Sequence, residues 1–197
     1  MQTFRTSLIP LICLSVLAPA VVFADDFEHG REALQAGNVE QAIAIWQPLA
    51  EAGDRDAQHA IGMVFEYGHG TAPNDRAAIA WYQKAAEQDL PAAQYRLGVL
   101  HDNGWGTPRN AARAVYWYSR AAELGHAFAQ HDLAFMYFNG TGVAPDRVQA
   151  YKWLRIASMT RPDLMIKHLS YVATGMPAAE IEKAEKQAAA WLEAQKI

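Results

Sequence analysis

The sequence predicts an all-α fold, a right-handed α-solenoid built from about five stacked helix hairpins. Two observations predict it: the chain repeats itself every 36 residues, and apolar residues recur at helical spacing within each unit. A two-helix unit of this size cannot bury its apolar stripe alone, so neighbouring units must stack against one another. We therefore expect about ten helices and no strand.

The repeat is carried by glycine, tryptophan and alanine. Trp81 recurs after 36 residues as Trp117 and again as Trp153. So many matches in one register exclude coincidence. They continue with Gly62 and Gly98, with Gly68, Gly104 and Gly140, with Gly70, Gly106 and Gly142, and with Ala85-Ala86-Glu87 and Ala121-Ala122-Glu123.

Each unit should contain two helices separated by a short loop. The first helix should end at a glycine, because glycine tolerates the left-handed conformation found at helix ends. The second helix should begin after an Asn or Asp whose side chain caps free backbone N–H groups. The expected ends are Gly68, Gly104 and Gly140, and the expected caps are Asn74, Asn110 and Asp146.

The chain begins with the features of a secretory signal peptide. Arg5 is followed by an apolar stretch, and Val22-Phe23-Ala24 places small residues before Asp25. We expect cleavage after Ala24 and export to the bacterial periplasm, without stable membrane insertion afterwards. The alternative is an uncleaved membrane anchor, which two prolines within the stretch disfavour.

Removing residues 1–24 also removes the single cysteine, Cys13. Lipid attachment at Cys13 is disfavoured, because Leu-Ile precedes it without the small residues that such processing needs. The mature chain then has no disulfide, no thiol nucleophile and no cysteine-based metal site. Its 16 Lys and Arg against 21 Asp and Glu give a net charge of −5, which disfavours nucleic acid or anionic lipid as a partner.

The remainder divides into a central array and two irregular ends, as expected for the caps of a repeat array. We assign residues 25–56 to an N-terminal cap hairpin and residues 165–197 to a C-terminal cap, in which Pro177 starts the final helix. The repeats between them are residues 57–92, 93–128 and 129–164.

The unit from Ala92, AAQYRLGVLHDNGWGTPRNAARAVYWYSRAAELG, is similar to Sel1-like repeats, which are relatives of the tetratricopeptide repeats. The third unit departs from the pattern, with Ala134 in place of glycine and Leu154, Ile156 and Ser158 in place of the usual Tyr, Lys and Ala. The resemblance implies an adaptor or scaffold. Exported bacterial members look like regulators of envelope sensors, assembly factors for surface structures, or parts of secretion and polysaccharide machinery.

No catalytic constellation stands out. The Gly-x-Gly loops follow no strand, none of the seven histidines forms a His-x-x-x-His pair, and Gly-x-Ser-x-Gly is absent. His101 takes the position of Phe65 and Tyr137, which predicts a packed structural imidazole. We therefore expect no catalytic residue, no cofactor and no metal.

Two alternative functions stay open. Catalytic groups scattered across repeats could form a periplasmic hydrolase acting on cell-wall peptides or β-lactams. Another is a structural spacer without a partner.

The face of each first helix opposite its buried stripe is the predicted binding groove for an unknown protein or peptide partner. A solvated face should carry Lys and Glu, whereas the first helix of the third unit, which starts at Ala129, is apolar nearly all round. Acidic side chains in the groove would select a basic partner element. The predicted groove residues are His59, Met63 and Glu66; Tyr95, Val99 and Asp102; and His131, Phe135 and Phe138.

Two open alternatives concern this surface. The final helix, residues 177–195, could fold into the groove and bury Phe135 and Phe138 itself. Trp105 lies in a loop whose sister loops carry His69 and Thr141, and it is either an exposed binding anchor or an indole that packs over its own hairpin.

Overall fold

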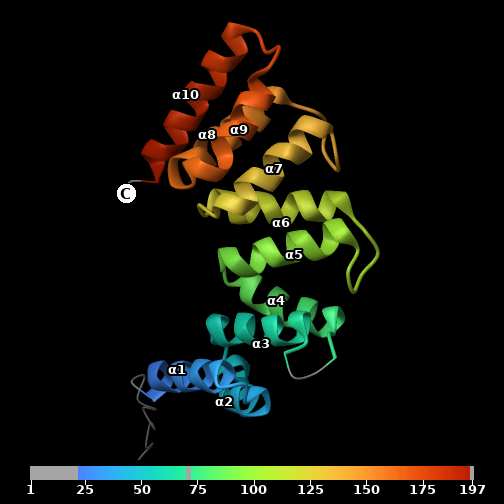
Figure 1. Cartoon of the computed structure of the whole chain (residues 1–197), viewed down its shortest axis with the longest axis vertical. Helices are drawn as coiled ribbons and strands as arrows, with labels where there is room; N and C mark the ends of the chain where they lie inside the picture. The colour runs from blue at the N-terminus through green and yellow to red at the C-terminus, as the bar shows by residue number, and fades with distance from the viewer. Residues whose placement is uncertain (1–21, 70–71, 196–197) are drawn as a thin grey trace, which may run out of the picture.

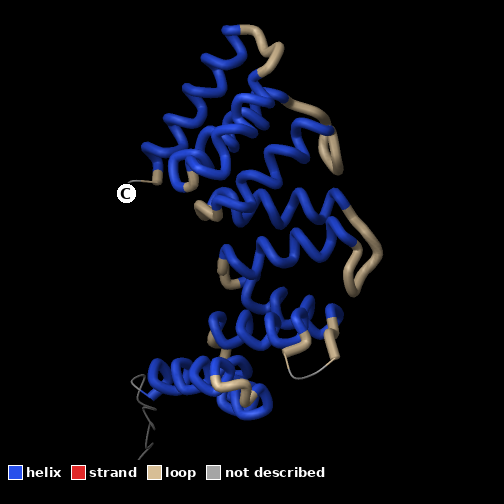
Figure 2. The backbone as a smooth tube through the Cα atoms, viewed as in Figure 1, coloured by secondary structure: helices blue, strands red, loops and turns tan. Residues whose placement is uncertain are grey.

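The computed structural model describes residues 22–69 and 72–195, and every regular element among them is a helix (Figure 2). Figure 1 shows the helices arranged as an elongated stack that runs from α1 and α2 at one end to α10 at the other. The prediction of an all-α stack of helix hairpins is confirmed. The helices are α1 (Val22–Gln35), α2 (Val39–Glu51), α3 (Arg55–Tyr67), α4 (Asp75–Glu87), α5 (Pro91–Asn103), α6 (Ala111–Glu123), α7 (Ala127–Asn139), α8 (Arg147–Thr160), α9 (Pro162–Ala173) and α10 (Ala178–Ala194).

The helix ends lie where local residue chemistry predicts them. Gly68, Gly104 and Gly140 end α3, α5 and α7 in the left-handed conformation. The side chains of the three predicted caps accept a backbone N–H bond three residues on, at 3.0–3.1 Å, so each second helix begins as expected. Each first helix begins two residues before the predicted unit boundary, at Arg55, Pro91 and Ala127.

The two helices of a unit interlock through a glycine and a tyrosine. A Cβ atom added to Gly98 would lie 2.4 Å from the Tyr118 ring, and one added to Gly62 would lie 2.7 Å from the Tyr82 ring. Only a residue without a side chain lets the buried aromatic ring lie flat against the helix backbone. The repeated glycine is therefore a close-packing residue within its helix.

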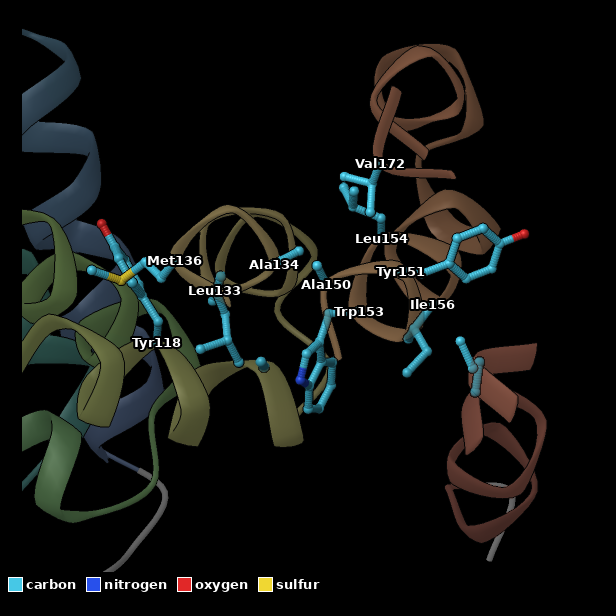
Figure 3. Close-up of a cluster of buried hydrophobic side chains, with 14 of the residues drawn as sticks. Tyr118, Leu133, Ala134, Met136, Ala150, Tyr151, Trp153, Leu154, Ile156 and Val172 are labelled. Atoms are coloured by element: carbon cyan, nitrogen blue, oxygen red, sulfur yellow. The ribbon is translucent and has the colours of Figure 1, made fainter. Parts of the chain in front are cut away.

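The third unit forms the same contact between its two helices with different residues. Ala134 stands where the first two units have glycine, and Leu154 stands where they have tyrosine. Both are fully buried in one cluster, part of which Figure 3 shows. A smaller aliphatic side chain leaves room for the Cβ of Ala134, so the two departures from the repeat pattern compensate each other.

The C-terminal end forms a three-helix cap around α8. Both α9 and α10 pack against α8, so the fifth hairpin is not a copy of the others. Trp191 of α10 lies edge-on to Trp153 of α8, and its Nε1 donates to Glu123 Oε2 at 2.7 Å. The alternative in which α10 fills the groove is therefore wrong, because the buried stripe of α10 is used against α8.

Candidate binding site

The nine predicted groove residues lie on α3, α5 and α7, and the structure brings five of them together. These five line one hollow of about 490 Å³ between α5 and α7. The other four, His59, Met63, Glu66 and Phe138, do not line it. The five are Tyr95, Val99, Asp102, His131 and Phe135.

The hollow also contains residues that the helix-face argument did not single out. Tyr118 of α6 and Met136 of α7 line it, and Figure 3 shows the tyrosine ring beside the methionine side chain. Asp132 adds a second carboxylate beside Asp102. Residues at the loop ends complete the lining: Asn103, Arg109, Asn139 and Thr141. Asp132 stands one repeat after Arg96, whose contact with Glu66 forms only when the helices stack, so the sequence carried no signal for Asp132.

Asp132 is the centre of the hydrogen bonding in the hollow. Its Oδ1 accepts a hydrogen bond from His131 Nδ1 at 2.7 Å. Burial, together with the charge of Asp132 and a hydrogen bond to it, raises the pKa of Tyr95 to about 12. Burial and the charges of Asp132 and Asp102 also raise the pKa of Tyr118. Both phenols therefore stay neutral at physiological pH.

Residues of α9 contact α7 next to the hollow, although none of them lines it. His131 Nε2 lies 2.9 Å from His168 Nδ1, and His168 meets the Phe135 ring edge-on. Phe138 packs against Tyr171 with ring centres 5.4 Å apart. The nearly all-apolar α7 is thus covered on this side by α9 and not by the final helix.

The histidine pair was invisible to a search for spacing on one helix, because its members come from two helices. In the described ranges, no group of three His, Cys, Asp or Glu side chains is arranged to hold a metal ion. His101 is buried, as predicted, and burial lowers its pKa. Nor is any helix in those ranges long and apolar enough to cross a bilayer.

The predicted role of Glu66 is contradicted by its surroundings. Its side chain is only 5% exposed and forms a buried ion pair with Arg96, while the Tyr82 hydroxyl donates to Glu66 Oε2 at 2.7 Å. The His59 ring lies tilted against the Tyr82 ring with centres 5.4 Å apart, and burial lowers the pKa of His59 to about 4. Glu66 therefore has no free charge to offer a partner, because the next repeat already supplies its cation.

Trp105 lies in the loop after α5 with 49% of its surface exposed, and it does not line the hollow. Its backbone N–H bonds to the Leu100 carbonyl oxygen at 3.0 Å and so holds the turn. The proposed role of the indole as a binding anchor remains a prediction.

Comparison with known proteins identifies the type of repeat. The model of the Sel1 repeat matches residues 55–90, 91–126 and 127–159, more than half of the chain. These ranges begin at the observed starts of α3, α5 and α7. A search among proteins with curated functions finds no match.

Two solved structures are similar to this one. A Sel1 repeat protein from Oxalobacter formigenes is 30% identical with a TM-score of 0.70, over 77% of this chain and 60% of that one. A protective antigen of uropathogenic Escherichia coli strains with an SLR fold is 28% identical with a TM-score of 0.72, over 85% of this chain and 40% of that one. This chain thus spans less than two thirds of either. It belongs to the Sel1 repeat family, whose members are generally protein-interaction modules.

Proposed function

We propose that this chain is a non-catalytic interaction module of the bacterial cell envelope, which binds a protein or peptide on the concave face lined by α5 and α7. The hollow of about 490 Å³ between these helices carries the proposal. It sets the aromatic rings of Tyr95 and Phe135 beside two carboxylates. A concave site with aromatic surfaces and a few placed polar groups is the usual form of a recognition site.

The aromatic residues at the hollow supply the test. Changing Tyr95 and Phe135 together to serine should abolish partner binding while costing little stability, since both side chains are only partly buried. Tyr116→Ser is the matched control, because Tyr116 is an exposed tyrosine on α6 outside the hollow. A double variant that unfolds while its folded fraction still binds the partner normally would show that these rings are core residues.

The partner can be captured with a photo-crosslinking amino acid in periplasmic extract. Asn139 is exposed at the edge of the hollow, and Glu32 on α1 is an exposed position far along the chain. We expect a discrete adduct from position 139 that is absent from position 32 and from the Tyr95 and Phe135 double variant. Equal adducts from both positions would contradict recognition at this face.

Export is the second part of the proposal, and it rests on the sequence alone. Residues 1–21 of the predicted signal peptide lie outside the described residues. Intact-mass measurement on the chain extracted from the envelope should show a protein that begins at Asp25. A full-length chain, or one carrying lipid at Cys13, would contradict export with cleavage.

Neither of the two similar proteins favours the hydrolase alternative, and we expect no labelling of this protein by a fluorescent penicillin.

A further inference from the structure

The repeats of this chain provide their own reference for the hollow. Four equivalent positions meet where one unit stacks on the next: an acid near the end of the first helix, the residue after it, a tyrosine on the second helix, and a residue on the following first helix. At the first junction, between α3 and α5, they are Glu66, Tyr67, Tyr82 and Arg96. At the second junction, between α5 and α7, they are Asp102, Asn103, Tyr118 and Asp132.

The first junction is a filled arginine site. Arg96 Nε donates to Glu66 Oε2 at 2.9 Å, and a second guanidinium N–H bonds to Glu66 Oε1. The guanidinium lies 5.2 Å from the centre of the Tyr67 ring. The Tyr82 hydroxyl completes the site by donating to the same carboxylate. A planar cation held by a carboxylate fork beside an aromatic ring is the geometry that arginine prefers.

The second junction keeps the acid and the tyrosine but lacks the cation. Asp132 stands in the place of Arg96, and Asn103 stands in the place of Tyr67, so two shorter side chains face the volume that the hollow occupies. Two carboxylates, Asp102 and Asp132, now line one cavity. A positive group between them would be attracted by both carboxylates.

The hydroxyl of Tyr118 is a second and independent sign of a missing partner. Tyr118 is only 3% exposed and lines the hollow, yet no residue in the described ranges forms a hydrogen bond with its hydroxyl. Its counterpart Tyr82 donates to Glu66. Asp102 is one methylene shorter than Glu66, which accounts for the lost contact. Because Tyr118 lines the hollow, its hydroxyl is available for a ligand.

Arg109 does not take the place that Arg96 has at the first junction. It reaches Asp102 from the loop between α5 and α6, with its Nε on the Asp102 carbonyl oxygen at 2.6 Å and one terminal nitrogen on Oδ1 at 3.1 Å. Its side chain is 64% exposed, against 20% for Arg96. Arg109 therefore pairs with Asp102 from the rim, whereas in the described ranges Asp132 is contacted by His131 and forms no ion pair with an arginine or a lysine.

We propose that the second junction binds one arginine side chain of the partner, in the manner in which Arg96 occupies the first junction. This rests on the proposed function, because the arginine is to come from the protein or peptide bound on that face. The guanidinium would lie between Asp102 and Asp132, with the Tyr118 oxygen available to accept one of its N–H groups. A lysine ammonium has no planar fork with which to bridge both carboxylates.

The probe for this site is Nα-acetyl-L-arginine methylamide, titrated into the full chain and followed by NMR shifts of the Asn103 side-chain amide and the Asp132 backbone amide. We expect saturable shifts at these positions, weaker ones with the lysine analogue, and none with the citrulline analogue, which has the same shape without the charge. Shifts scattered over the surface, or equal shifts with citrulline, would overturn the proposal.

Variants of the junction should change the affinity in opposite directions. Asp132→Asn and Asp102→Asn should each weaken binding about tenfold, because each removes a charge-assisted hydrogen bond. Arg109→Ala should strengthen binding by freeing Asp102.

Asp132→Arg restores the residue of the first junction, so it should abolish binding of the analogue and raise the Tm of the chain by about 3 °C. Glu32→Arg, with the same charge change on α1, should do neither. An Asp132→Arg variant that binds the arginine analogue like the wild type would overturn the site.

The crosslinking assay separates this inference from the proposed function. Adducts at position 139 that persist unchanged in Asp132→Arg leave the interaction face in place and overturn the arginine site. If the analogue binds at Asp132 but position 139 captures nothing that competes with the analogue, the arginine site stands and the proposed function fails.

Discussion

The first two repeats and the third repeat with its cap have the same architecture but bury their surfaces differently. From α3 to α6, glycine packs beneath tyrosine, and the acid of the first junction is matched within the chain. From α7 to α10, Ala134 and Leu154 replace that pair, and the aromatic face of α7 is covered by α9. The hollow lies at the boundary between the two regions. A repeat array can therefore keep its backbone register while one junction changes from a structural contact into an open site.

The largest expected effect on stability comes from copying Ala134 of the third unit to the equivalent position of the second unit, Gly98. Gly98→Ala places a Cβ 2.4 Å from the Tyr118 ring, and we expect it to lower the free energy of unfolding by about 2–3 kcal/mol. Adding Tyr118→Leu should recover part of that loss, as the Ala134 and Leu154 pair does. Urea unfolding measures both. A Gly98→Ala variant as stable as the wild type would show that the glycine is not a packing residue.

The first unit contributes to the pH dependence of stability through His59, a position that is Tyr95 in the second unit. Burial lowers the pKa of His59 to about 4, whereas histidine in an unfolded chain titrates near pH 6.5. Between these values the unfolded chain binds more protons, so the free energy of unfolding should fall as the pH drops from about 6.5 to 4. His59→Tyr, which copies Tyr95 of the second unit, should reduce that fall. Unfolding curves at pH 7 and pH 5 test it, and an unchanged pH dependence would contradict it.

The helix caps should not distinguish the two regions. Asn110→Ala and Asp146→Ala each remove a side-chain bond of 3.0 Å to a free backbone N–H, so each should cost about 1 kcal/mol. Thermal unfolding of the two variants compares them directly. A much larger cost for one of them would show that its side chain has a role beyond capping.

The smallest effect is expected in the loops. Trp105→Thr copies Thr141 of the third unit, and because the indole is half exposed the change should cost less than about 1 kcal/mol. Weakened crosslinking at position 139 with this small loss would make Trp105 a binding residue. A drop in Tm beyond about 4 °C would instead mean that the indole packs on its own hairpin.

The sequence by itself determined the period, the helix ends and the class of fold, because these depend on residues close together along the chain. A glycine that ends a helix and an asparagine that begins one act within a few residues of their own positions. The helical spacing of apolar residues also placed the predicted groove residues on α3, α5 and α7, five of which line the hollow.

Tertiary structure alone decided which of those residues are free. Glu66 meets Arg96 across 30 residues and His131 meets His168 across 37, and both pairings arise only when helices stack. A helix wheel shows which way a side chain points but not what approaches it from the next unit. The same limit hid the packing of α10 on α8, because an apolar stripe does not specify which neighbour will cover it.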